Sequence, residues 1–193
     1  MDIARSFSHM FKDSSWFFKV FLGGTFLVGS VVLIGLPFIV GYIIEDIRAV
    51  AGRNESILPE WKNLRQLYKQ GIVVLCAGLI YAVLFAACSI AVSGKLETTS
   101  IVAGIFVLIF VWMPVVLIQY AKRLTFFSCF SILEIVKPCA LHPLLYAKSL
   151  AAGFLTIAAS ILFGWMSMIV GWPFVIFWGI LVQSQILGQL AAL

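Results

Sequence analysis

Uncharged apolar windows alternate with charged segments along this chain. The windows cover residues 20–44, 70–94, 98–121 and 149–193, and none of them contains Asp, Glu, Lys or Arg. A helix needs about 20 consecutive apolar residues to cross the hydrocarbon core of a bilayer. Every window reaches that length, so the pattern predicts a chain embedded in a membrane.

The composition agrees with this pattern. Of the 193 residues, 63% are hydrophobic and 11% are charged, and the mean hydropathy is +1.11. Soluble domains carry about 25% charged residues, so this chain has too few charges to cover a surface in water. The length suits a single membrane domain, residues 1–193, without room for a second catalytic domain.

Positive charges predict the side of the membrane on which each segment lies. Of the Lys and Arg residues, three precede the first window, five lie in residues 45–69, one is Lys95, and four follow residue 121. Cytoplasmic segments of membrane proteins are enriched in Lys and Arg. We therefore attribute the net charge of +5 to this enrichment and expect no nucleic-acid partner.

The last three windows are interpreted as transmembrane helices. Residues 70–94 and 98–121 each suit one crossing, joined by a tight outer turn at Lys95. Residues 149–193 are long enough for a hairpin of two helices, with a break at Gly171, Trp172 and Pro173. Both termini are then cytoplasmic.

The first window, residues 20–44, allows two arrangements. A single kinked span leaves nine Lys and Arg inside and four outside, whereas a hairpin leaves twelve inside and one outside. The hairpin fits the positive-inside rule better, and Gly29, Gly35 and Pro37 supply an interruption. Two half-helices of about 15–18 Å are too short for full crossings, so we favour a re-entrant or shallow hairpin.

Three charged segments complete the predicted architecture. Residues 1–19 form an interfacial amphipathic helix, residues 45–69 a cytoplasmic segment, and residues 122–148 a second interfacial segment. The fold class is therefore all-α: a polytopic membrane helical bundle of about four transmembrane helices, an amino-terminal hairpin and interfacial helices.

The cytoplasmic segments hold the candidate contact residues. Glu45, Asp46 and Glu60 alternate with basic residues, which indicates an ion-pair network that anchors the loop rather than a metal site. Basic and aromatic residues at the membrane face suit lipid phosphates or an acidic partner, and Trp61 is predicted to lie at the headgroup level. The candidates for lipid or partner contact are Arg48, Arg53, Trp61, Lys122, Arg123, Gln185 and Gln189.

Polar groups inside the windows are few. Gln185 and Gln189 share one face of a helix and can either bond across helices or line a polar path. Pro37, Pro114 and Pro173 each precede a Tyr or Trp by five or six residues, which resembles the broken helices of some transporters. No nucleophile–base pair or metal cluster is present, so we expect no enzyme activity, catalytic residue or cofactor.

One string resembles the signature of a prokaryotic integral-membrane family, the domain of unknown function 4013. Its residues are Gly41, Tyr42, Glu45, Arg48, Gly52, Arg53, Leu58, Pro59, Glu60 and Trp61. The resemblance extends to Trp16 to Lys19, Gly23 and Gly24, Met113 and Pro114, Gln119 to Ala121, and Gln183 to Gln189. Lys62 stands where the family usually has Asp. The resemblance implies a prokaryotic inner-membrane protein and brings no established activity.

The sequence thus favours a non-enzymatic scaffold or an accessory subunit of a larger membrane assembly. Its expected partners are membrane lipids, together with other proteins or further copies of the chain. The alternative is a passive conduit, or a lipid or small-solute transporter, built on the proline-broken helices.

Overall fold

The computed structural model describes residues 11, 13–52, 58–93, 104, 107–141, 143–166 and 171–192. Within these residues every regular element is helical, and the chain forms a helical bundle. The elements are α2 (Trp16–Gly29), η2 (Ser30–Val32), α3 (Leu36–Ala51), α4 (Leu64–Ser93), η3 (Leu108–Trp112), α6 (Met113–Arg123), η4 (Phe126–Phe130), α7 (Ile132–Leu141), α8 (Pro143–Met166) and α9 (Trp172–Ala191).

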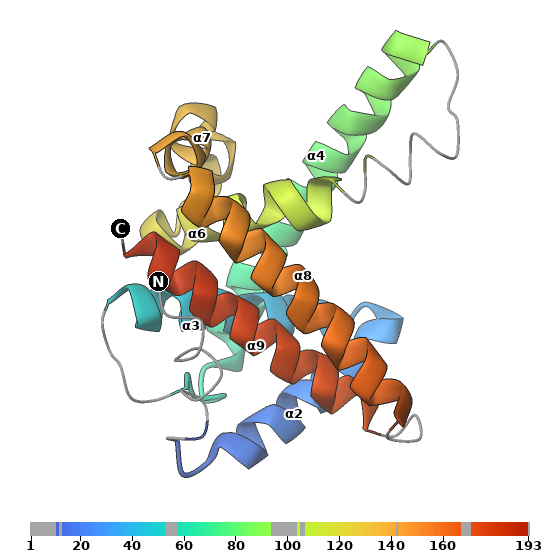
Figure 1. Cartoon of the computed structure of the whole chain (residues 1–193), viewed down its shortest axis with the longest axis vertical. Coiled ribbons are helices and arrows are strands. Elements are labelled where there is room, and N and C mark those ends of the chain that lie inside the picture. The colour runs from blue at the N-terminus through green and yellow to red at the C-terminus, as the bar shows by residue number, and fades with distance from the viewer. Residues whose placement is uncertain are drawn as a thin grey trace.

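Helix α9 is the centre of the bundle. It packs against α2, α3 and α8, while α3 also packs along α4, and α8 and α9 run side by side (Figure 1). Of the most apolar window of α9, 61% of the residues are buried, compared with 22% for α4. Helix α4 is therefore peripheral, and its later half extends away from the other helices (Figure 1).

Three described helices are long and apolar enough to cross a membrane. The candidate spans are Leu64–Cys88, Pro143–Phe163 and Trp172–Ala191. Most of residues 98–106, the first part of the span predicted at 98–121, lies outside the described residues. The remainder of that predicted span is the π-helical turn η3 followed by α6.

The prolines of the apolar windows lie near the beginning of three helical elements. Pro37, Pro114 and Pro173 each lie in the first turn of α3, α6 and α9, respectively. The first turn tolerates proline because its backbone N–H groups have no partner within the helix. Pro37 and Pro173 therefore mark helix starts, whereas Pro114 directly follows the π-helical turn η3 within one helical run that ends at Arg123.

Residues 20–44 contain a reversal of the chain. After α2 and the turn η2, Leu33 adopts a left-handed conformation with φ of 63°, and α3 then returns along α2. Phe26 of α2 stacks on Phe38 of α3, with ring centroids 4.8 Å apart. The two helices have 14 and 16 residues, about 21 and 24 Å, and are longer than the predicted half-helices because both continue into the charged segments.

Candidate functional site

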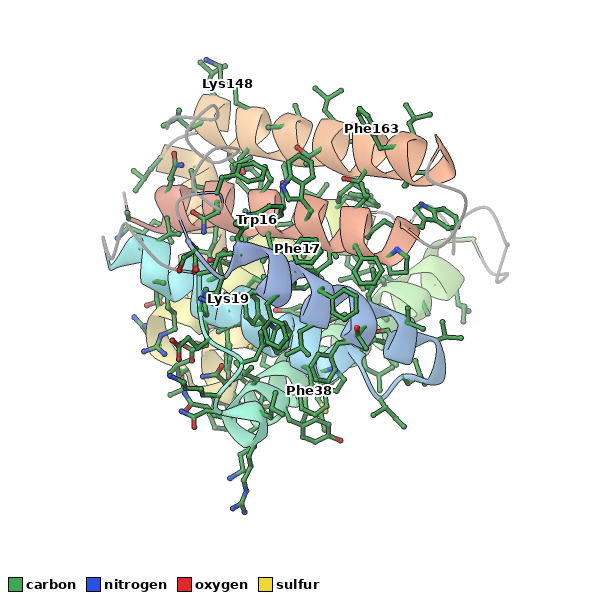
Figure 2. All side chains as sticks on the ribbon, turned by 90° about the horizontal axis from the view of Figure 1, so that it is seen from below. Trp16, Phe17, Lys19, Phe38, Lys148 and Phe163 are labelled. Atoms are coloured by element: carbon green, nitrogen blue, oxygen red, sulfur yellow. The ribbon has the colours of Figure 1, made fainter. Side chains whose placement is uncertain are left out.

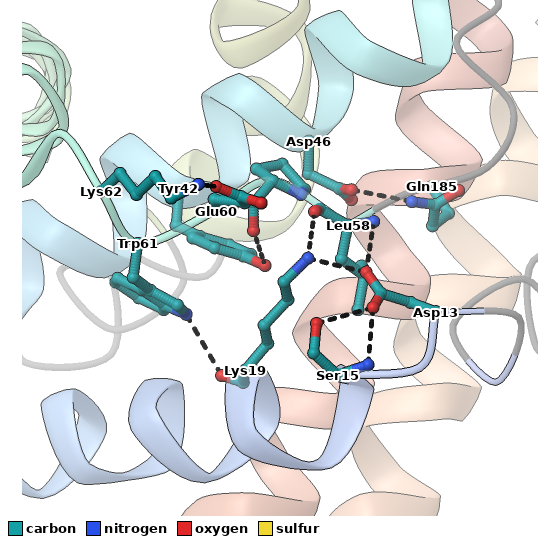
Figure 3. Close-up of polar contacts among 11 residues, drawn as sticks. Asp13, Ser15, Lys19, Tyr42, Asp46, Leu58, Glu60, Trp61, Lys62 and Gln185 are labelled. Carbon is teal, nitrogen blue, oxygen red and sulfur yellow. Dashed lines mark hydrogen bonds and ion pairs between the residues drawn. The ribbon is translucent and has the colours of Figure 1, made fainter.

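The most buried ion pair among the described residues lies at the start of α2, and both of its members bond to the loop before α4. Asp13 and Lys19 are each only 6% exposed, and Lys19 Nζ lies 2.7 Å from Asp13 Oδ2. Lys19 also donates to the carbonyl oxygen of Leu58 at 2.6 Å, and the Leu58 amide donates to Asp13 Oδ2 at 3.1 Å (Figure 3). We call Asp13, Lys19 and Leu58 the clasp.

The clasp provides hydrogen-bond partners for the backbone of a segment that has no secondary structure of its own. Residues 58–60 belong to no helix or strand, and a buried backbone N–H or C=O without a partner is costly. Leu58 is 1% exposed, so its backbone groups depend on the two charged side chains. Burial raises the pKa of Asp13, but hydrogen bonds from Lys19 and Ser15 and the charge of Lys19 outweigh this and hold the pKa at about 2.

Tyr42 and Trp61 extend the clasp to α3. The hydroxyl of Tyr42, which is fully buried, donates to the Pro59 carbonyl oxygen at 2.8 Å, and Trp61 Nε1 donates to the Lys19 carbonyl oxygen at 3.2 Å (Figure 3). The two rings stack with centroids 4.2 Å apart, and Trp61 also stacks on Phe26 at 5.0 Å. The half-buried Trp61 ring thus packs between protein side chains, and its predicted position at the headgroup level stays a prediction.

The Tyr42 hydroxyl provides a small, local test of the clasp. Tyr42→Phe keeps the stacked ring but leaves the Pro59 carbonyl without this donor, so we expect the free energy of unfolding to fall by about 1–3 kcal/mol. Denaturant unfolding of the protein in a mild detergent, monitored by tryptophan fluorescence, measures the change in the midpoint. An unchanged midpoint would show that the hydroxyl contributes nothing to the folded state.

Asp46 forms a second buried polar contact, between α3 and α9. Its carboxylate is 1% exposed and accepts hydrogen bonds from the Ser184 hydroxyl and from Gln185 Nε2, the latter at 2.8 Å. The expected role of Asp46 in an ion-pair network is therefore wrong, because its partners are neutral groups on α9. Helix α3 lies outside the three candidate spans. Burial raises the pKa of Asp46 to about 7, although the two hydrogen bonds partly oppose the shift.

This raised pKa predicts how stability depends on pH. The folded-state pKa of Asp46 exceeds its ordinary value of 3.8, so its contribution is complete below about pH 4 and is lost as the pH rises through about 7. Relative to Asp46→Asn, the wild-type protein should lose up to about 4 kcal/mol between pH 4 and pH 8. Parallel unfolding curves at four pH values test this, and a constant difference between the two proteins would contradict it.

The expected ion pairs around α3 form on its outer side. Arg48 Nη1 lies 3.2 Å from Glu45 Oε1, and the Lys62 ammonium contacts Glu60. Glu45 also accepts from Gln66 Nε2 at 3.2 Å and from Gln70 Nε2 at 2.7 Å. Glu45 therefore ties the end of α3 to the start of α4.

The remaining predicted residues lie apart from the clasp. Arg123 pairs with Glu134 of α7, and Lys122 beside it is exposed. Gln185 bonds Asp46, as described above, and Gln189 is a half-buried residue one turn further along α9. Arg53 lies outside the described residues. The structure thus brings Trp61, Arg48 and Gln185 to the region around α3, while Lys122 and Arg123 mark the separate junction of α6 and α7.

The buried charges of Asp13, Lys19 and Asp46 were not predicted from the sequence. One signal was available for the first two: Lys19 stands among aromatic and aliphatic residues, six positions after an aspartate that can turn the chain. Asp46 carries no such signal because its partners are 138 and 139 positions away.

The chemistry of these groups is that of structural contacts. Asp13, Lys19 and Asp46 each bond to protein groups on another element. Among the described residues, no group of three or more His, Cys, Asp or Glu side chains has a geometry that could hold a metal ion. The arrangement can fix helices and a loop relative to one another.

Comparisons with known proteins agree with the sequence signature. A family model described as "Protein of unknown function (DUF4013)" matches residues 25–183. Comparisons with curated proteins and with solved structures found no significant match. The family match covers most of the chain, including Tyr42, Asp46, Leu58, Trp61 and α9 as far as residue 183. The chain therefore belongs to the DUF4013 family of proteins of unknown function.

Proposed function

We propose that this chain is a non-enzymatic integral membrane protein that serves as a scaffold or accessory subunit of a larger membrane assembly in a prokaryotic inner membrane. The observation that carries the proposal is the use of the buried ionisable side chains. Asp13, Lys19 and Asp46 bond to other parts of the fold, and none of them lines the cavity beside α2 or the two cavities where α4 begins. Charged groups used in this way stabilise one arrangement of the helices.

The later half of α4 presents a surface that a partner helix would fit. Leu79, Val83 and Leu84 are 67%, 62% and 52% exposed, and this half extends away from the bundle (Figure 1). Ala87 and Ala91 lie one turn apart and are both exposed. Small residues four positions apart allow membrane helices to approach closely, so this face suits another transmembrane helix.

Site-specific photocrosslinking in cells tests the proposal. A photoreactive residue at Ala87 should give a discrete protein adduct of one size, because the partner helix occupies a fixed position. Leu162 of α8, which is 69% exposed, is the matched control and should give mainly lipid adducts. If both positions capture lipid alone, the scaffold proposal fails.

The membrane arrangement is part of the same proposal. The reversal between α2 and α3 supports a shallow hairpin, which places both termini and nearly all of the positive charge on the cytoplasmic side. Labelling of single cysteines with a membrane-impermeant reagent in intact cells measures this topology. Protection of a cysteine placed before α2 is expected, and strong labelling there would instead indicate a single span.

One cavity favours the alternative of a lipid or small-solute conduit. A groove of about 620 Å³ is lined almost entirely by apolar atoms between α2 and the neighbouring ends of α8 and α9. Trp16 and Phe17 of α2 and Phe163 of α8 lie along it (Figure 2), and Phe21 stacks on Phe174 across it at 5.1 Å. Liposomes that contain the protein should then move labelled lipid between leaflets, and the absence of transfer by verified, inserted protein would eliminate this alternative.

A further inference from the structure

Two adjoining cavities lie where α4 begins, on the side of the molecule that carries most of the charged residues of α3 and α4. The first, of about 420 Å³, is lined by residues that include Glu45, Arg48 and Glu60. The second, of about 460 Å³, is lined by Asn63, Arg65, Gln66 and Lys69. Asn63 and Gln66 line both, so the two cavities adjoin, and we call them together the edge site.

The two ends of the edge site carry opposite charge. Two carboxylates and one guanidinium line the first cavity, whereas two cations and no carboxylate line the second. Arg48 already pairs with Glu45. Glu60 contacts Lys62, but the side chains of that pair are 50% and 80% exposed, and such exposed pairs are weak. The first cavity therefore suits a cationic group, and the second suits an anion.

Arg65 and Lys69 have no acidic partner among the residues that the structure describes. Both are exposed, and neither forms an ion pair with another residue that the structure describes. They lie one turn apart on α4, so their side chains share a face of the helix. Two adjacent cations on one helical turn can hold a phosphate group between them.

The same face of α4 continues as an apolar surface. At helical spacing after Arg65 and Lys69 come Ile72, Leu79 and Val83, which are 37%, 67% and 62% exposed. Arg65 and Lys69 also lie within the candidate span Leu64–Cys88, close to its beginning. A ligand held there has its polar part at the membrane edge and an apolar surface beside it along the helix.

We propose that the edge site binds the headgroup of an aminophospholipid. The phosphate contacts Arg65 and Lys69, and the primary ammonium group donates hydrogen bonds to Glu45 and Glu60. An acyl chain lies along Ile72, Leu79 and Val83. A headgroup with a phosphate and a primary amine matches both charges, while an anionic headgroup without an amine matches only one.

Native mass spectrometry of the purified full chain tests the proposal. The protein in detergent is titrated with lipids of identical acyl chains that carry ethanolamine, choline or glycerol headgroups. The ethanolamine lipid should be retained most strongly, because the quaternary choline group has no N–H to donate and glycerol carries no positive charge. Soluble glycerophosphoethanolamine should compete poorly, because it lacks the acyl chains that lie on α4.

Variants separate the two halves of the edge site. Arg65→Gln with Lys69→Gln should weaken binding of all three lipids by about 30-fold. Glu60→Gln should reduce the preference for ethanolamine over choline while leaving binding of the glycerol lipid unchanged. Lys148→Gln, which removes an exposed cation near the start of α8, is the matched control and should change nothing. Unchanged unfolding midpoints confirm that the variants fold.

Three results would overturn the proposal. These are equal retention of the three lipids, undiminished binding by the Arg65 and Lys69 double variant, and full competition by the soluble headgroup. Preferential retention of the glycerol lipid would assign the edge site to an anionic lipid instead and would contradict a role for Glu45 and Glu60.

Discussion

Replacing Lys19 with methionine is expected to lower the free energy of unfolding by about 3–5 kcal/mol. The apolar stem is retained, but Asp13 then keeps a buried negative charge without its cation, and the Leu58 carbonyl loses its donor. Breaking one side of a buried ion pair is costly because the remaining charge stays desolvated. Tryptophan fluorescence during detergent unfolding gives the change directly, because Trp61 bonds to the Lys19 carbonyl.

A second pair on the same loop provides the control. Lys62 contacts Glu60, and both side chains are largely exposed, so Lys62→Met should leave the unfolding midpoint nearly unchanged. The double variant Asp13→Asn with Lys19→Met removes both charges and should recover part of the stability lost in Lys19→Met. Equal losses for Lys19→Met and Lys62→Met would contradict the account of the clasp.

The lowered pKa of Asp13 also predicts how the stability of the folded protein changes at acidic pH. The folded-state pKa is about 2, below the ordinary value of 3.8, so the contribution of Asp13 is present above about pH 4 and is lost as the pH falls through about 2. The wild-type protein should therefore lose stability over this range relative to Asp13→Asn.

Replacing Gly71 with alanine is expected to cost about 3 kcal/mol or more. Helices α3 and α4 cross at two glycines: a Cβ atom at Gly71 would lie 1.8 Å from the Pro37 carbonyl oxygen, and one at Gly41 would lie 2.0 Å from the Leu67 carbonyl oxygen. Backbone atoms cannot move aside as a flexible side chain can, so the two helices must separate. Their separation also displaces Tyr42, which follows Gly41, from the Pro59 carbonyl.

Gly78 on the same helix is the matched control for Gly71. A Cβ atom there would meet only the side chain of Met113, at 3.4 and 3.5 Å. Alanine is also a better helix former than glycine by about 1 kcal/mol, so Gly78→Ala should be neutral or slightly stabilising. Thermal unfolding of the two variants under identical detergent conditions provides the comparison, and similar midpoints would refute the close crossing of α3 and α4.

The helical bundle could be predicted because it follows from a property that is local in the sequence. Long uncharged windows require helices in a membrane, and the structure has a helical bundle with three helices suited to cross one. The ends of the helices were less predictable because they do not coincide with the boundaries between uncharged windows and charged segments. Helix α3 continues past residue 44 to Ala51, and α4 begins at Leu64, before the predicted span at residue 70.

The buried polar contacts could not be predicted because they are properties of the folded chain. Asp13 and the Leu58 amide are 45 positions apart, and Asp46 and Gln185 are 139 apart. By local charge pattern, Asp46 resembles Glu45 beside it, yet Asp46 faces α9 while Glu45 faces α4. Adjacent residues on a helix point in directions about 100° apart, and only the position of α9 determines which carboxylate is buried.

The most direct test of the account is the mass of the assembly that contains this chain. The membrane is extracted with its native lipids into polymer-bounded discs, and the tagged chain is purified and weighed by native mass spectrometry. If the chain is a scaffold or accessory subunit, we expect a complex in which it is present in a fixed ratio with at least one other membrane subunit. Recovery of the chain only as a monomer would contradict the proposed role, provided that a control membrane complex extracted in the same way keeps its subunits.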